Sequence, residues 1–120
     1  MLVRFVAVVL VACSACNAGP QSSVAIGVLN LEEEPRRLVE VCLERRCTGV
    51  NTVLEHGDEA IVTVNPRGEA AVQVKIEKRG GKQEVLPCAV RLHAGSSGAI
   101  QIALSQSKLR VLENKLRDKH

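Results

Sequence analysis

Apolar and polar residues alternate along most of this chain with the period of two that is typical of β-strands. The clearest case is residues 70–78, where Val72, Val74 and Ile76 alternate with polar side chains. Because successive side chains of a strand point to opposite faces, one face of this strand is predicted to be buried and the other solvated. Similar runs between turn signals predict strands at residues 24–30, 37–46, 52–54, 60–64, 70–78, 85–93 and 99–104.

Seven short strands without an intervening helix favour two packed sheets. In the second strand, Val39, Val41 and Leu43 are predicted to share one face. Residues 54–64, LEHGDEAIVTV, resemble a segment common in bacterial immunoglobulin-like and fibronectin-like sandwiches, with a leucine, a glycine turn, an acid and an alternating strand. His56 stands where proline is frequent in that segment. The resemblance implies an all-β fold, an Ig-like two-sheet β-sandwich over residues 24–105.

The period changes near the C-terminus. The spacing of Leu109, Leu112 and Leu116 by three and four residues predicts one face of a helix that starts at about Ser107. We therefore expect residues 106–120 to form a short basic amphipathic helix. Its leucines would dock on the sandwich or on a partner, and its bases would face water or an anionic lipid surface. These bases are Lys108, Arg110, Lys115, Arg117 and Lys119.

The N-terminus carries the pattern of an export signal. Arg4 precedes the unbroken apolar run FVAVVLVA at residues 5–12, which is far shorter than the roughly 20 residues of a membrane span. The following Leu10-Val11-Ala12-Cys13 resembles the bacterial lipobox. The resemblance implies cleavage before Cys13 and a diacylglyceryl group on its sulfur. Residues 1–12 would then be a signal peptide, and residues 13–23 a lipid anchor and tether.

Ser14 follows the expected anchor where an aspartate would be needed for retention in the inner membrane. By resemblance to enterobacterial lipoproteins, this implies an outer-membrane lipoprotein that faces the periplasm. Three other interpretations of the N-terminus stay open. An ordinary secretory signal could be cut after Ala15 or Ala18, Cys16 could be the modified residue, or the run could be a buried cytosolic strand. The polar residues 17–23 disfavour the last.

Composition excludes several classes of ligand. The single Phe, Tyr or Trp residue of the chain is Phe5, which would leave with the signal peptide. Stacking platforms for single-stranded nucleic acid and aromatic cages for quaternary ammonium groups are therefore excluded. Because Arg4 is the only charged side chain of residues 1–12, its loss lowers the net charge from +3 to +2. We expect no nucleic-acid partner and no cofactor.

Three cysteines lie in the expected domain, and export to an oxidising compartment favours disulfides. On one straight strand, Cys42 and Cys47 would face opposite sides, so they could pair only if residues 43–46 formed a turn. The sequence favours instead a bridge from Cys88 to one of them. Such a bridge would close a loop of about 40 residues and contribute roughly 3 to 5 kcal/mol.

The same cysteines offer a less favoured metal site. Cys42, Cys47, Cys88 and His93 are a possible ligand set for zinc or copper(I), although the spacing of the first pair is atypical.

A catalytic triad would need His56 and Asp58 together with Ser96 or Ser97. No nucleophile elbow and no glycine-rich phosphate loop supports it, so the sequence predicts a protein that is not an enzyme.

The leading hypothesis is an envelope lipoprotein whose sandwich is a non-catalytic interaction or assembly module. Its membrane contact would be the lipid anchor, and its partner another envelope protein. The candidate interaction residues are Leu109, Leu112, Leu116, Arg110 and Arg117. One alternative is a periplasmic hydrolase inhibitor with residues 94–98 as its protruding loop. Another is a metal-binding lipoprotein that uses the Cys/His set.

Overall fold

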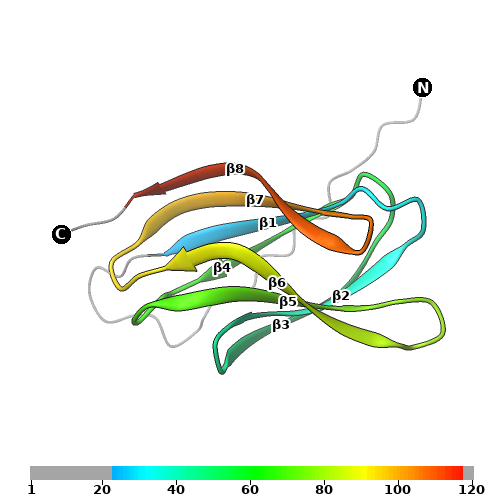
Figure 1. Ribbon diagram of the computed structural model, residues 1–120, viewed down its shortest axis with the longest axis horizontal. Coiled ribbons are helices and arrows are strands. Elements are labelled where there is room, and N and C mark those ends of the chain that lie inside the picture. Colours follow the sequence, from blue (N-terminus) through cyan, green and yellow to red (C-terminus); the bar gives the residue numbers. More distant parts are fainter. Residues whose placement is uncertain (1–22, 118–120) are drawn as a thin grey trace.

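The computed structural model describes residues 23–117, which form two packed four-stranded sheets (Figure 1). Sheet A has the strand order β4-β1-β7-β8 and sheet B the order β3-β2-β5-β6. The parallel pair is β1 with β7, and the other neighbours are antiparallel. The strands are β1 (Val24–Asn30), β2 (Arg36–Leu43), β3 (Arg46–Leu54), β4 (Glu59–Val64), β5 (Ala70–Glu77), β6 (Gln83–Leu92), β7 (Ser97–Ser105) and β8 (Lys108–Arg117).

The core lies between the sheets and is made of aliphatic side chains. In β5, every second residue is buried, and Val72, Val74 and Ile76 are at most 1% exposed. The burial pattern of β5 confirms the predicted alternation. The two packed sheets confirm the predicted two-sheet β-sandwich. The largest fully buried side chains come from both sheets, namely Ile26, Leu38, Ile76, Leu92, Ile102 and Leu104.

The second strand differs from its prediction in two ways. A register shift at Val39 places Leu38 in the core with Val41 and Leu43. The reason is that a bulge adds one residue to the strand, so the side chains before it point to the opposite face from the one that regular alternation would give them. The chain then turns at Glu44, whose φ is 54°. The predicted strand 37–46 therefore contains all of β2 except Arg36, a tight turn and the first residue of β3.

The C-terminal segment is a strand, and the predicted helix is wrong. β8 pairs with β7 along its whole length, so the described sandwich extends to Arg117 and contains eight strands. Leu109, Val111 and Leu116 pack against the core, while Leu112 is 44% exposed. The helix-like spacing has a simple cause. A bulge at Leu112 adds one residue, so Leu109 and Leu116 share a face although they are seven positions apart, an odd offset that would put them on opposite faces of a regular strand.

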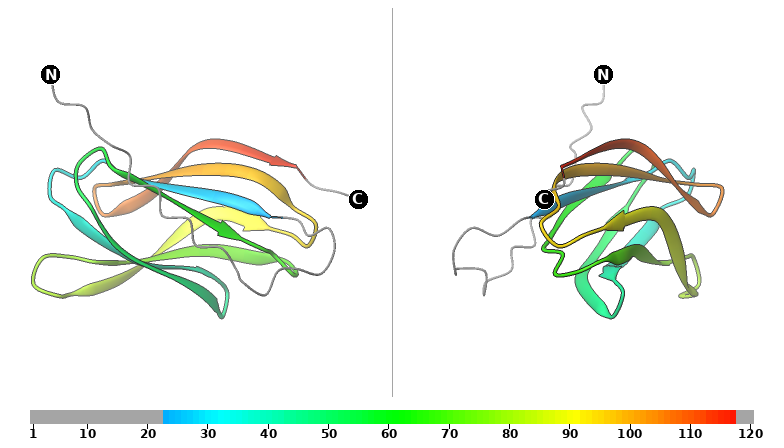
Figure 2. Two further views of the ribbon diagram at one scale, coloured as in Figure 1. Left: turned by 180° about the vertical axis from the view of Figure 1, so that it is seen from behind. Right: turned by 60° about the vertical axis from the view of Figure 1, so that its left-hand side comes forward.

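The loops gather at two ends of the sandwich (Figure 2). We call the end at which β1 begins the proximal end, because the chain enters the sandwich there at Ser23. It also holds residues 44–45, 65–69 and 93–96, together with the last residues of β8. The distal end holds residues 31–35, 55–58, 78–82 and 106–107.

Candidate interaction surfaces

The structure does not bring the residues of the hypothetical triad together. His56 and Asp58 lie in the β3–β4 loop at the distal end. Ser96 lies in the β6–β7 turn at the proximal end, and Ser97 is the first residue of β7 there. The Ser96 hydroxyl accepts a hydrogen bond from His93 N at 2.9 Å, and its residue is 1% exposed. Residues 94–96 therefore form a tight turn that this hydrogen bond closes, and residues 97–98 begin β7, so residues 94–98 do not form a long protruding loop of the kind that the inhibitor hypothesis needs.

Cys42 and Cys47 form a disulfide, and the prediction of a bridge from Cys88 is wrong. The two bonded residues stand directly opposite each other on β2 and β3, because the chain reverses between them. Cys88 is a buried free thiol on the core face of β6. Burial raises the pKa of this thiol above its ordinary value, because desolvation disfavours the thiolate.

The four residues of the hypothetical metal site are not assembled. The Cys42 and Cys47 sulfurs are bonded to each other, Cys88 is in the core, and the His93 side chain lies near Glu69 at the surface. Within residues 23–117, the Cys42 and Cys47 sulfurs have one further candidate ligand nearby, the Glu40 carboxylate. Sulfurs held in a disulfide are poor ligands, because metal binding needs the thiolate.

The predicted interaction residues at the C-terminus do not form one face. Leu109 and Leu116 point toward the core, Leu112 points outward at the bulge, and Arg110 and Arg117 are exposed. A common face for the three leucines exists only on a helix, so the predicted leucine stripe is absent from strand β8.

The four edge strands differ in how strongly they oppose pairing with another chain. Natural proteins protect such edges with bulges, prolines and charged side chains. Edge strand β8 has the bulge at Leu112 and five charged residues, and β6 has Pro87 and an irregular register with β5. Edge strand β3 has a register shift and Asn51 at a φ of 52°.

Edge strand β4 has fewer of these protections than the other three edges. Its six residues, EAIVTV, pair with β1 without a register shift, and Glu59 is its single charged residue. The Glu59 carboxylate accepts a hydrogen bond from Gln101 Nε2 at 2.7 Å. The remaining side chains are apolar or, at Thr63, neutral. Viewed from behind the orientation of Figure 1, β4 lies at the margin of sheet A (Figure 2).

The outer face of sheet A next to β4 carries an open depression of about 230 Å³. Its lining combines small or apolar residues with polar side chains, namely Ala25, Gly27, Ile61, Ala99 and Ile100 with Glu59, Gln101, Glu113 and Lys115. A side chain at position 27 would meet the Glu59 carboxylate at 2.6 Å, so glycine leaves room for this carboxylate and its bond to Gln101. A strand added beside β4 would place alternate side chains over this face.

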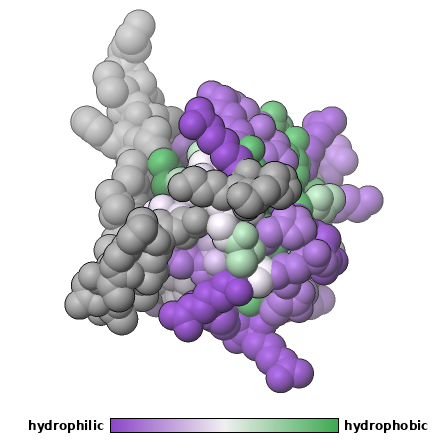
Figure 3. All heavy atoms as spheres, turned by 90° about the vertical axis from the view of Figure 1, so that its left-hand side faces the viewer, coloured by the Kyte–Doolittle hydropathy of each residue, from purple (hydrophilic) through white to green (hydrophobic). Residues whose placement is uncertain are grey.

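The proximal end carries a cluster of arginines. Arg45 and Arg46 of the β2–β3 turn and Arg67 of the β4–β5 loop line one open depression of about 410 Å³. All three are exposed, and within residues 23–117 none of them forms an ion pair. Figure 3 faces this end and shows strongly hydrophilic side chains projecting around its margin.

The two acids beside this arginine cluster have other partners. Glu44 accepts a hydrogen bond from the Ala71 backbone N–H at 3.3 Å. Glu69 pairs with Arg91 at 2.8 Å and with His93 at 3.5 Å. Both acids line the same depression as the arginines. Arg91 balances the charge of Glu69, so Glu44 is the one carboxylate of this lining left to offset the three guanidinium groups.

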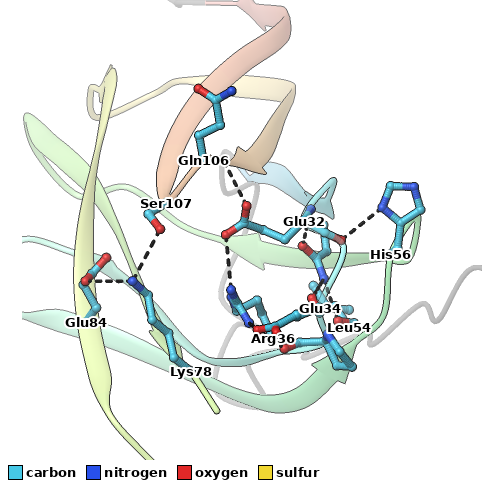
Figure 4. A network of polar contacts seen from close by, with 11 residues as sticks. Glu32, Glu34, Arg36, Leu54, His56, Lys78, Glu84, Gln106 and Ser107 are labelled. Atoms are coloured by element: carbon cyan, nitrogen blue, oxygen red, sulfur yellow. Dashed lines mark hydrogen bonds and ion pairs between the residues drawn. The ribbon is translucent and has the colours of Figure 1, made fainter.

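The distal end contains a network of polar contacts (Figure 4), in which one buried atom, Arg36 Nε, has no hydrogen-bond partner among the described residues. The Glu32 carboxylate accepts a hydrogen bond from Gln106 N at 2.9 Å and pairs with Arg36 at 3.6 Å. Lys78 reaches Glu84 at 3.2 Å and Ser107 Oγ at 3.4 Å. These contacts connect both sheets, since the β7–β8 turn belongs to sheet A and the β5–β6 hairpin to sheet B.

Asn30 is the buried centre of this network and is 0% exposed. Its amide nitrogen donates to Leu54 O at 2.7 Å and to Glu34 O at 3.2 Å, and its Oδ1 accepts from Glu32 N at 2.9 Å. A buried amide needs such partners, because an unpaired polar group in the interior is costly. Asn30 thus holds the β1–β2 and β3–β4 connections together.

The comparisons with known proteins add no family. No protein-family model, no curated protein and no solved structure matches the chain. Among residues 23–117, no helix is long and apolar enough to cross a membrane. Cys13 and the predicted signal peptide lie outside the described residues.

Sequence reasoning missed three features of these surfaces. Asn30 falls on the same side of strand β1 as Val24, Ile26 and Val28, two positions after the last of them. This spacing alone could have predicted that Asn30 is buried. The uncharged run after Glu59 was visible in the sequence, but its position at an edge depends on the strand order. The arginine cluster joins residues about 20 positions apart, so only the fold brings them together.

Proposed function

We propose that this protein is a lipid-anchored envelope protein whose β-sandwich is a non-catalytic docking module for another envelope protein. The lipobox-like residues 10–13 support the anchor, and the ordered sandwich starts only eleven residues after Cys13. The observation that carries the docking proposal is edge strand β4, whose regular, nearly uncharged edge contrasts with the three protected edges.

The proposed contact is the addition of a partner strand to β4. Backbone hydrogen bonds supply affinity in such contacts, and pockets for alternate side chains supply specificity. This mode suits a domain that has no Phe, Tyr or Trp after residue 5, because it needs no aromatic anchor. The open depression beside β4 would receive the partner's side chains.

The docking proposal is tested by photo-crosslinking in the bacterium that makes the protein. A photoreactive residue replaces Ile61 or Thr63, which point outward from β4, and a matched control carries it at Ala89 on protected edge β6. We expect one discrete adduct with an envelope protein from the β4 positions and none from Ala89. Equal adducts from both edges, or none from β4, would refute docking at β4.

The anchor is tested separately by the intact mass of protein extracted from membranes. The expected mass is that of a chain starting at Cys13 that carries two or three acyl chains. A mass without acyl chains would refute the anchor and leave the β4 result to stand on its own.

A further inference from the structure

We propose that the arginine cluster of Arg45, Arg46 and Arg67 is a docking surface for the anionic phosphate headgroups of a membrane, and that it turns the proximal end of the sandwich toward the bilayer. The orientation part rests on the proposed lipid anchor. The headgroup contact rests on the geometry of the cluster alone. The three arginines come from two loops and surround one open depression.

The first argument is charge. The guanidinium groups form no ion pair within residues 23–117. Of the two acids that line the same depression, Glu69 is paired with Arg91, so the three positive charges outnumber the one remaining carboxylate, Glu44. Guanidinium matches phosphate oxygens with two parallel hydrogen bonds. Each basic residue close to an anionic membrane surface improves binding roughly fivefold, so three together give about a 100-fold gain.

The second argument is position. The chain enters the sandwich at Ser23, which is at the same end as the arginine cluster. Eleven residues from Cys13 to Ser23 span at most about 40 Å when fully extended, so an anchored domain stays near the bilayer. The tether alone does not fix which face of the domain points to the lipid. A cationic surface at the point of attachment supplies that orientation.

The experiment uses the mature lipidated chain in vesicles, with Cys16→Ser to remove the expected reactive thiol of the tether. A donor fluorophore is placed at Gly68→Cys, where an added side chain meets nothing within 4 Å, and an acceptor is carried by lipid headgroups. A second chain carries the donor at Lys82→Cys on the distal end. The vesicles contain either phosphatidylcholine alone or phosphatidylcholine with about a third phosphatidylglycerol.

We expect energy transfer from position 68 to rise on the anionic vesicles and transfer from position 82 to fall. The triple variant Arg45→Gln, Arg46→Gln, Arg67→Gln should abolish both changes, as should 0.5 M salt. A matched control, Arg79→Gln, Lys82→Gln, Lys108→Gln, removes the same charge from the distal end and should leave the changes at position 68 intact. This control carries the donor at position 68 only.

Two results would overturn the proposal. One is equal energy transfer on neutral and anionic vesicles. The other is an equal loss in the cluster variant and the control variant, which would show that net charge acts without the cluster. If the mature chain carries no acyl chains, its sedimentation with the same vesicles replaces energy transfer. An affinity for anionic vesicles that falls about 100-fold in the cluster variant would then support the headgroup contact without the anchor.

Discussion

Each end of the sandwich carries a cluster of charged side chains, and the two clusters are built differently. At the distal end, Glu32, Arg36 and Lys78 are tied to partners across both sheets, around the buried amide of Asn30. At the proximal end, Arg45, Arg46 and Arg67 share one depression with Glu44 and Glu69 but form no ion pair within residues 23–117. Paired charges hold loops together, whereas unpaired like charges repel one another. We infer that the distal end serves stability and the proximal end serves binding.

The largest expected effect comes from breaking the distal network at its centre. Asn30→Leu leaves the Leu54 carbonyl and the Glu32 N–H buried without partners, so the free energy of unfolding should fall by about 2 to 4 kcal/mol. Urea unfolding measures the loss. The control Asn114→Ala, at an exposed position of β8, should cost less than about 1 kcal/mol. Equal losses at both positions would contradict a special role for Asn30.

A smaller loss is expected from opening the proximal hairpin. The Cys42–Cys47 disulfide closes a very short loop, so replacing both residues by serine should lower the free energy of unfolding by about 2 kcal/mol. A bridge from Cys88 would have given the larger value expected for a long loop. Peptide mapping of the unreduced protein should find Cys42 linked to Cys47, and a linked Cys88 would contradict the structure.

A third test measures how the stability of the core between the two ends depends on pH. Burial raises the pKa of Cys88, so the folded chain keeps the thiol proton at a pH where the unfolded chain loses it. The folded state then binds more protons, and stability must fall as the pH rises above about 9. We expect a loss of stability near pH 10 that is missing in Cys88→Ala. The same loss in both proteins would assign it to other groups.

The smallest effect should come from the arginine cluster. Replacing Arg45, Arg46 and Arg67 by glutamine removes no ion pair among the described residues, so the free energy of unfolding should change by less than about 1 kcal/mol. Thermal unfolding at low salt measures it. A clear loss of stability would show that the arginines are structural and would weaken the contrast between the two ends.

The local pattern predicted some elements well and others poorly, for identifiable reasons. Strand β1 matches its predicted bounds, and β5 matches to within one residue. Regular alternation with one buried face is compatible with a strand and not with a helix, so the pattern predicts these elements correctly. Strand β8 was predicted as a helix because its bulge at Leu112 imitates helical spacing. The cysteine pairing failed for a related reason, since a turn at Glu44 without glycine, proline or asparagine gives no sequence signal.

The sequence by itself determined the all-β class, the aliphatic core and the absence of aromatic anchors after residue 5, because these follow from composition and from the period-two alternation. The tertiary structure decided which strands are edges, which cysteines meet and which charges are left unpaired. The strand order placed β4 at a weakly protected edge, and the packing of two loops brought Arg67 to Arg45 and Arg46. Such features depend on contacts between residues distant in the chain, which no local pattern encodes.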